Sequence, residues 1–492
     1  MSDSSMPEEL PLTRADLRRE KNYIDGRWVD SDDRIMVRNP ATGRILGSIP
    51  DAGADEAELA VAAAARAFPQ WSALSAAERA GKLLRWHDLI LDHREDLARL
   101  ITAEQGKPIG EALWEVGYAA SFIRWFAEEA RRVYGDIIPG HARDMRIAVT
   151  REPVGVTAAI TPWNFPLAMI SRKAGPALAV GCTMVVKPSE LTPFSALALA
   201  LLAGEAGIPN GVLNIVAGEA QPIGKVLVTH PEIAKLSFTG STGVGKMLAS
   251  VAMQSVKRLS LELGGNAPFI VFDDADLEAA LDGVMASKFR NAGQTCVCAN
   301  RFYVQSGIYD VFVDRLAKRI AGLQVGNGMI DGVNVGPLIN DAAVTKVQSH
   351  VDDASSRGAR VLLGGHAIDG AGHFFQPTLV RDLPPDARLC REETFGPLAG
   401  IVSFDTEGQA IAMANEGNAG LAAYFYTRDL SRSHRVAEAL QYGMVGLNTG
   451  QISTEVAPFG GIKQSGFGRE GSRYGIDEYL NMKLVCTAIE GE

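Results

Sequence analysis

The first third of the chain carries apolar residues at the spacing of amphipathic helices. Such patterns run over residues 57–67, 75–104 and 110–133, and each predicts a helix with one buried face. The first helix is expected to open at Asp55, because Glu58 follows three residues later as in a capping box. Helices are therefore expected to dominate this part of the chain.

From residue 154 onward, short apolar runs alternate with helical stretches. The runs at 154–160, 183–186, 212–216 and 234–238 predict buried strands, and Thr192 followed by Pro193 predicts the start of an intervening helix. Strands separated by helices imply right-handed crossovers and a parallel, doubly wound sheet. Ligands of such sheets bind beyond the carboxyl ends of the strands, so unusual residues at those ends are candidates for a site.

A second region of alternating strands and helices begins after residue 263. Apolar runs at 268–272, 301–305 and 360–365 predict its strands and make a second α/β domain plausible. Between residues 135 and 151 a hydrophilic stretch ends in the alternating sequence RIAVTR, which is typical of a hairpin. We expect this hairpin to form an arm that packs on another subunit.

Composition and charge narrow the classes of function. The chain has 492 residues, of which 47% are hydrophobic and 22% charged, and its formal net charge is −10. An acidic chain argues against a nucleic-acid binder and against a surface that adheres to anionic membranes. No stretch approaches the ~20 apolar residues of a membrane helix, and the five cysteines are too scattered for a disulfide framework. We therefore expect a cytoplasmic protein.

Two motifs at predicted strand ends are candidates for nucleotide binding. The sequence FTGSTGVG (238–245) follows a strand and opens a helix, so its backbone N–H groups can face a phosphate, although its glycine spacing is neither that of the dinucleotide fingerprint nor that of a P-loop. A glycine turn before a helix explains it equally well. In VVKPSE, Lys187 and Glu190 follow a strand. A carboxylate there accepts hydrogen bonds from an adenosine ribose and repels a 2′-phosphate, which favours NAD over NADP.

Cys296 and Glu262 are candidates for chemistry. Small and polar neighbours in NAGQTCVCAN indicate a loop whose N–H donors depress the pKa of a thiol or hold an oxyanion, whereas a lone cysteine is more often a buried apolar residue. Glu262 lies in an apolar strand, where burial raises the pKa of a carboxyl and favours a general base, and a salt-bridged strand end is the alternative. Cys298 forms a C-x-C pair with Cys296, but no further cluster completes a metal site.

At these residues the sequence resembles the aldehyde dehydrogenase superfamily. The resemblance rests on seven motifs in the family's order and spacing: TPWNFP (161–166), KPSE (187–190), FTGSTGVG (238–245), LELGGNAP (261–268), GQTCVCAN (293–300), EETFGP (392–397) and PFGGIKQSGFGREGS (458–472). It implies an α/β fold with a Rossmann-like parallel-sheet domain for NAD(P) (1–134 and 152–262), an α/β catalytic domain (263–458) and a small β oligomerisation arm (135–151 and 473–492). It also implies a homodimer or homotetramer.

The resemblance assigns roles residue by residue. It makes Cys296 the nucleophile, Glu262 the base that activates water and Asn164 a donor to the oxyanion. The cofactor, NAD with NADP as a possible substitute, is then expected to be held by Trp163, Lys187, Glu190, Gly240, Ser241, Glu393 and Phe395. Cys298 is a candidate for a reversible oxidative bridge with Cys296, and a small residue that lines the pocket is the alternative.

Within the superfamily the chain is most similar to succinate-semialdehyde dehydrogenases. The matching stretches are AEQGKPIGEA (103–112), residues 171–200 and KFRNAGQTCVCANRFYV (288–304). In that group two arginines and a serine hold the carboxylate of the aldehyde, and they match Arg172, Arg290 and Ser453. Glutarate semialdehyde is one methylene longer and stays open as a substrate, because one methylene contributes only about 1–3 kcal/mol of discrimination. A thioester-forming hydrolase and a catalytically silent member of the family are the rival interpretations.

Overall fold

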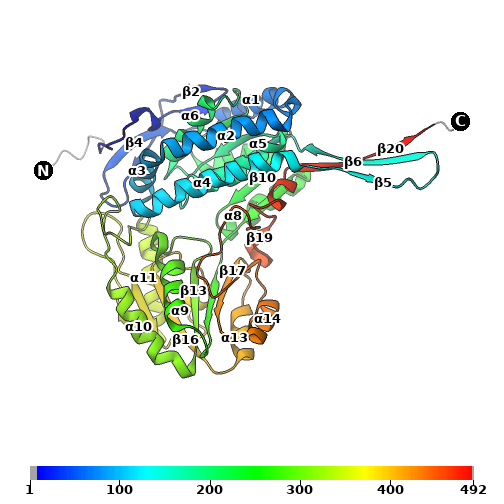
Figure 1. The fold of residues 1–492 in the computed structure, drawn as a ribbon. Helices are drawn as coiled ribbons and strands as arrows, with labels where there is room; N and C mark the ends of the chain where they lie inside the picture. The colour runs from blue at the N-terminus through cyan, green and yellow to red at the C-terminus, as the bar shows by residue number, and fades with distance from the viewer. Residues whose placement is uncertain (1–7, 490–492) are drawn as a thin grey trace.

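The computed structural model describes residues 8–489, which form two α/β lobes and a projecting β arm (Figure 1). The predicted segments 1–134 and 473–492 include seven and three residues that lie outside this range. The helices are α1 (Ala54–Ala73), α2 (Ala76–Asp92), α3 (Arg94–Gln105), α4 (Ile109–Glu129), α5 (Ala168–Val180), α6 (Pro193–Glu205), α7 (Ala220–Thr229), α8 (Thr242–Ala252), α9 (Leu277–Val284), α10 (Tyr309–Ala321), α11 (Asp341–Ser356), α12 (Arg388–Arg391), α13 (Glu407–Asn415), α14 (Leu430–Ala439) and α15 (Tyr474–Asp477). None of the helices within 8–489 is long and apolar enough to cross a membrane.

The first lobe is built on an eight-stranded sheet with the order β19-β11-β10-β7-β8-β9-β1-β2. Its strands are β1 (Asn22–Ile24), β2 (Arg27–Val29), β7 (Val156–Ile160), β8 (Thr183–Lys187), β9 (Leu213–Ile215), β10 (Ile233–Thr239), β11 (Arg258–Glu262) and β19 (Gly466–Phe467). The five central strands, β11 to β9, are parallel. The chain winds outward from β7 through β8 to β9 and then returns to place β10 on the other side of β7. The predicted doubly wound sheet is therefore confirmed, with its switch point between β7 and β10.

The second lobe is built on a seven-stranded sheet with the order β14-β15-β16-β13-β12-β17-β18. Its strands are β12 (Ala267–Val271), β13 (Ala299–Gln305), β14 (Arg360–Leu363), β15 (Thr378–Arg381), β16 (Leu398–Phe404), β17 (Ala422–Tyr426) and β18 (Met444–Leu447). The sheet is parallel except at β14, an antiparallel edge strand. Alternate residues of β12 enter different cores: Ile270 packs on one face and Phe269 and Val271 on the other. Helices therefore cover both faces, as a buried parallel sheet requires.

The arm contains three antiparallel strands, β5 (Asp136–Ile138), β6 (Met145–Pro153) and β20 (Leu480–Ala488). The strands β5 and β6 form the predicted hairpin, and β20 pairs along the whole length of β6. Figure 1 shows the arm extending away from both lobes. A separate two-stranded sheet joins β3 (Arg34–Arg38) to β4 (Ile45–Pro50).

Two details of the predicted helices were wrong. Helix α1 begins at Ala54, and Glu56 rather than Glu58 closes its first turn by accepting a hydrogen bond from the Gly53 N–H at 2.8 Å. The pattern over 75–104 forms two helices separated at His93, whose backbone leaves the helical region at φ −108° and ψ 23°. The spacing of apolar residues does not reveal such a break, because the same helical spacing continues before and after His93.

Candidate functional site

A cavity of about 370 Å³ lies where β7, β10 and β11 end. It gathers eight of the predicted site residues: Trp163, Asn164, Gly240, Ser241, Glu262, Cys296, Glu393 and Phe395. They come from both lobes, because Cys296, Glu393 and Phe395 belong to the segments around the second sheet. Within the first lobe the cavity lies at the switch point, where ligands of doubly wound sheets bind.

Cys296 lies on a turn that follows an unusual stretch of backbone. The π-helical turn Met285–Phe289 leads into Asn291, Ala292 and Gly293, which have φ of 51°, 53° and 75°. Left-handed non-glycine residues and π-turns concentrate at functional sites. Burial raises the pKa of the Cys296 thiol to about 12, while the positive charge of Arg172 lowers it. The thiolate therefore depends on its surroundings for stabilisation.

Glu262 ends β11, beside Thr239 at the end of β10. Its side chain is buried, and neither carboxyl oxygen has a hydrogen-bond partner among residues 8–489. Burial raises the pKa of Glu262 well above its ordinary value, and the neighbouring charge of Glu470 raises it further. An unpaired carboxyl with a raised pKa that faces a cavity fits a general base rather than a salt-bridged strand end.

Asn164 follows the end of β7 and is buried beside the cavity. Its Nδ2 donates to the Gln294 carbonyl at 3.0 Å, so the side-chain amide is turned toward the loop that carries Cys296. The second Nδ2 hydrogen can still be donated, because a side-chain amide carries two.

The groups on the other side of the cavity fit a nicotinamide dinucleotide. Ser241 caps the 11-residue helix α8, whose first N–H groups can bind a phosphate. Glu393 accepts a hydrogen bond from the Gly265 N–H at 3.1 Å, and burial raises its pKa to about 7. The buried Thr239 hydroxyl lines the cavity without a partner among the described residues. Trp163 and Phe395 meet edge to face with centroids 5.6 Å apart.

Lys187 and Glu190 do not line this cavity. Lys187 ends β8 beside Ile160 of β7, and its Nζ forms an ion pair with Glu190 at 2.7 Å. Both residues lie at the carboxyl edge of the sheet, as the sequence predicted, and the Glu190 side chain is 37% exposed. Their contact with an adenosine ribose stays a prediction.

A second cavity, of about 20 Å³, shares Cys296 and Met169 with the first. Arg172, Arg290 and Ser453 line it together with Cys296, so the structure brings together the three residues matched to a substrate carboxylate. Arg172 is buried, forms an ion pair with Glu470 at 3.1 Å and donates to the Tyr118 hydroxyl at 3.1 Å. Its positive charge is therefore partly balanced by the carboxylate of Glu470, which also pairs with the buried Lys173.

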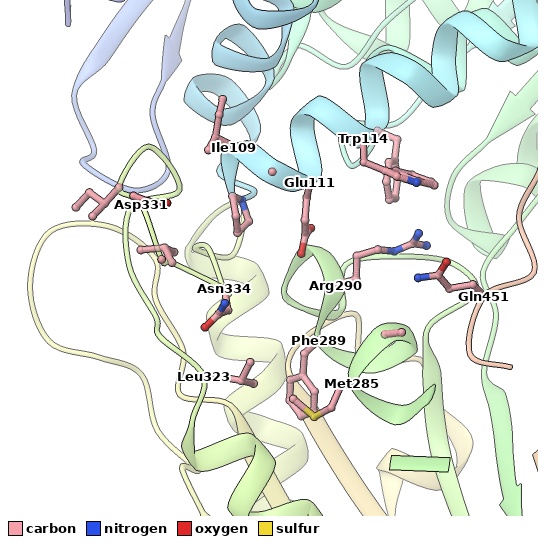
Figure 2. A pocket seen from close by; sticks show the side chains of 17 residues that line it. Ile109, Glu111, Trp114, Met285, Phe289, Arg290, Leu323, Asp331, Asn334 and Gln451 are labelled. Carbon is pink, nitrogen blue, oxygen red and sulfur yellow. The ribbon is translucent and has the colours of Figure 1, made fainter. Parts of the chain in front are cut away.

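Arg290 has a different environment. The described residues form no ion pair with Arg290, and its buried Nε has no hydrogen-bond partner among them, although its charge lowers the pKa of the nearby Glu111, which burial raises. Its guanidinium lies 5.0 Å from the ring centre of Trp114 and 5.8 Å from that of Phe165. Arg290 also lines an outer vestibule of about 580 Å³, and Figure 2 shows it beside Trp114 and Gln451 at one end of that space. Arg290 thus offers an unpaired positive charge between the vestibule and Cys296.

Cys298 lies behind the Cys296 turn. It is 8% exposed, its Sγ lies 3.4 Å from the Ala299 carbonyl oxygen, and burial raises its pKa. An oxidative bridge to Cys296 stays a prediction.

Sequence reasoning missed several residues of the site, among them Glu470, Trp114 and Tyr118. Glu470 lies in the quoted motif 458–472, but only the fold shows that it pairs with Arg172, 298 positions away in the chain. Trp114 and Tyr118 stack with ring centres 4.7 Å apart on one face of α4. Their spacing of four residues signals an aromatic pair on a helix but does not identify a cavity wall.

Comparisons with known proteins agree with this arrangement. The aldehyde dehydrogenase family profile matches residues 28–485. The glutarate-semialdehyde dehydrogenase of Pseudomonas aeruginosa is 59% identical over 97% of this chain and 99% of its own. The NADP(+) succinate-semialdehyde dehydrogenase GabD of Escherichia coli is 58% identical over 98% of this chain and 100% of its own. A crystal structure described as an E. coli NADP dependent enzyme has 58% identity and a TM-score of 0.96, and covers 97% of this chain and 100% of that one.

Proposed function

The chain belongs to the aldehyde dehydrogenase family, and we propose that it oxidises succinate semialdehyde to succinate with NAD or NADP. The observation that supports an acidic substrate is the unpaired guanidinium of Arg290 at the cavity of Cys296. A partly buried arginine without a counter-ion is costly unless a ligand supplies the negative charge. A carboxylate pairs well with it, because the guanidinium donates two parallel hydrogen bonds.

In this proposal the Cys296 thiolate adds to the aldehyde carbon. The new oxyanion accepts hydrogen bonds from the Asn164 side chain and the Cys296 backbone N–H. Removing one such donor typically costs about 3–4 kcal/mol of transition-state stabilisation. Arg172 favours this step as well, since its charge lowers the pKa of the thiol.

The residues on the cofactor side of the cavity would hold the electron acceptor. Ser241 and the start of α8 would bind the pyrophosphate, while Glu393 and Phe395 would position the nicotinamide ribose. Bound NAD(P) supplies the hydride acceptor that converts the adduct on Cys296 into a thioester. Glu262 then removes a proton from a water molecule, whose oxygen attacks the thioester carbon and releases the acid and the thiol. Covalent catalysis thereby separates oxidation from hydrolysis.

Glutarate semialdehyde is the second candidate substrate. Arg290 lies at the boundary between the inner cavity and the vestibule. The space beyond Cys296 therefore continues into the vestibule and does not restrict the substrate to one chain length. The relative from P. aeruginosa is named for this longer aldehyde. One methylene changes the selectivity by only about 1–3 kcal/mol, so both semialdehydes are expected to react.

Steady-state kinetics with three aldehydes and both cofactors test the proposal. We expect kcat/KM to be about 30-fold or more higher for succinate semialdehyde than for butanal, because a desolvated charge pair contributes about 2–5 kcal/mol. A higher kcat/KM for glutarate semialdehyde than for succinate semialdehyde would make glutarate semialdehyde the preferred substrate. Equal values for butanal and both semialdehydes would refute the acidic substrate, and acid formation without NAD(P) would support a thioester-forming hydrolase.

The proposal also assigns roles to the parts of the chain. Residues 1–134 and 152–262 form the NAD(P)-binding domain, and residues 263–458 form the catalytic domain. The segments 135–151 and 473–492 form an oligomerisation arm for a homodimer or homotetramer. The exposed apolar side chains of the arm, described below, support this assignment.

A further inference from the structure

The sequence AEQGKPIGEA (103–112) takes no part in the steps above, although it lies against the site. It forms the end of α3, the turn at Gly106 and the start of α4. Lys107 lies in that turn, and Glu115 lies further along α4. Both side chains are fully buried, and Lys107 Nζ forms an ion pair with Glu115 at 2.6 Å. A buried ion pair stabilises a protein little compared with apolar residues of the same volume, which favours a role beyond stability for this pair.

Both partners of this pair bind backbone groups of the segment that begins at the Asn164 carbonyl. Lys107 Nζ donates to the Asn164 carbonyl at 2.8 Å and lies 3.8 Å from the ring centre of Phe165. Glu115 Oε1 accepts hydrogen bonds from the Leu167 N–H at 3.0 Å and the Ala168 N–H at 3.3 Å. The pair therefore fixes the backbone from the Asn164 carbonyl to the Ala168 N–H, the segment that directly follows the Asn164 side chain.

A second set of contacts joins the same segment to the Cys296 loop. Asn291 Nδ2 also donates to the Asn164 carbonyl, at 3.1 Å, and Asn291 Oδ1 accepts a hydrogen bond from Gln105 Nε2 at 2.8 Å. Asn164 Oδ1 has no hydrogen-bond partner among the described residues, so no hydrogen bond to this oxygen orients the amide. Two features therefore orient the Asn164 amide: the position of its backbone and the one hydrogen bond that its Nδ2 donates to the Gln294 carbonyl.

We propose that Lys107 and Glu115 are positioning residues, which hold Asn164 so that its amide N–H faces the aldehyde oxygen of a substrate bound to Cys296. The proposal rests on the covalent step of the proposed function but not on the choice of substrate. An oxyanion donor acts only when it is held in place before the charge develops. A pair that fixes the peptide group after Asn164 and the start of α5 meets that requirement without touching the substrate.

A double-mutant cycle against Asn164 tests the proposal. The variants are Lys107→Met/Glu115→Gln, Asn164→Ala and the triple combination, and the readout is the rate of the first burst of NAD(P)H in a stopped-flow experiment. The pair variant should lower the burst rate about 10- to 100-fold, less than or equal to the ~10²–10³-fold expected for loss of an oxyanion donor. In the Asn164→Ala background the same changes should cost less than about threefold, because the group they position is absent.

The control is Lys235→Met/Glu478→Gln. Lys235 is also fully buried and lies 3.5 Å from Glu478, but the pair belongs to the opposite end of β10. This variant should leave the burst rate within about threefold of the parent in both backgrounds. Glu115→Gln alone provides a milder change if the double variant does not fold, and thermal unfolding identifies that case.

Two results would overturn the proposal. One is an equal loss for the pair variant in the parent and in the Asn164→Ala background, which would mean that Lys107 and Glu115 act independently of Asn164. The other is an unchanged burst rate in folded Glu115→Gln and in the folded pair variant. The loss should be the same with butanal and with succinate semialdehyde, since both present the same carbonyl oxygen. A wrong substrate assignment would alter the ratio of kcat/KM values for the two aldehydes. It would leave the coupling between the pair and Asn164 unchanged.

Discussion

Burial disfavours the thiolate of Cys296, and this predicts how the first half-reaction depends on pH. Its pKa is raised to about 12, so the reactive fraction is small at neutral pH and grows as the pH rises. The burst rate should increase about tenfold per pH unit between about 6 and 9 wherever thiolate formation limits it. Stopped-flow measurements at saturating cofactor check this. A plateau below about pH 8 would show that bound ligands lower the pKa of the thiol into the ordinary range.

In the proposed mechanism the second half-reaction depends on Glu262. Because both of its carboxyl oxygens lack partners, Glu262→Gln removes the base without breaking a hydrogen bond among the described residues. This variant should form one equivalent of NAD(P)H per active site and then stall at the thioester, with turnover about 10²–10⁴-fold lower. Cys296→Ala is the matched control and should show no burst while it still binds the cofactor. Parent-like turnover in Glu262→Gln would assign the base to another group.

The two arginines should respond differently to truncation. Arg290 has no counter-ion in the described residues, so Arg290→Ala should lower kcat/KM for succinate semialdehyde by about 30-fold or more and should leave butanal nearly unchanged. Arg172→Ala also removes one of the two cations that pair with Glu470, the other being Lys173, so the negative charge of Glu470 acts more strongly on Glu262 and both aldehydes should be impaired. The ratio of the two kcat/KM values measures the difference. Equal losses on both aldehydes in Arg290→Ala would show that Arg290 supports the fold.

At the scale of residues, the sequence predicted the candidate catalytic groups that meet at the cavity but not the charged groups that shift their pKa values. Cys296, Glu262 and Asn164 lie at strand ends or on a loop within recognisable motifs, and the structure places all three at one cavity. Glu470, which raises the pKa of Glu262, reaches the site through a contact between distant segments. No local pattern encodes such a contact, because side-chain pairing over that separation is decided by the packing of whole elements.

The strands were the elements that sequence located best. Each apolar run predicted in the first lobe coincides with a strand, since a fully buried parallel strand must be apolar along its length. The sequence did not reveal the π-helical turn Met285–Phe289 or the left-handed residues after it. Asn291 and Ala292 adopt the left-handed conformation because surrounding contacts impose it. Neither residue type predicts this conformation as strongly as glycine does.

Gly293 in this loop permits a close approach that a side chain would prevent. Its φ is 75°, and an added Cβ would lie 2.3 Å from the Gly396 carbonyl oxygen. Gly293→Ala should therefore lower the melting temperature and abolish the NAD(P)H burst, because the segment 293–296 must shift. Gly43→Ala is the control: Gly43 has a φ of 69° but open space around it, so only the backbone cost of about 1–2 kcal/mol applies. Similar melting temperatures and full activity in both variants would contradict the close approach.

For the molecule as a whole, the sequence predicted two α/β regions and a hairpin arm, and the structure contains them. It could not predict how the two sheets meet around Cys296. Trp163 and Asn164 come from one lobe and Glu393 and Phe395 from the other, and their approach depends on packing between elements that are far apart in the chain. The resemblance assigned 135–151 and 473–492 to one β arm, but no local pattern predicted that β20 pairs with β6, because about 330 residues separate the two strands.

The arm presents apolar side chains to solvent in the single chain. Ile137 is 91% exposed, Met482 74% and Leu484 65%, which is unusual for large apolar side chains on the strands of one small sheet. Open strand edges and exposed apolar surface on an isolated arm favour association with another copy of the chain. We therefore expect the protein to be a dimer or tetramer that buries this surface.

Changing one side chain of the arm should dissociate that assembly. Leu484→Glu places a charge where the proposed interface is apolar, and an unpaired buried charge costs several kcal/mol, so the mass in solution should fall toward that of one chain. Light scattering coupled to size-exclusion chromatography measures the mass. Leu430→Glu is the matched control, because Leu430 is 75% exposed at the start of α14, outside the arm. An unchanged mass in Leu484→Glu, or an equal loss in Leu430→Glu, would mean that the subunits associate through another surface.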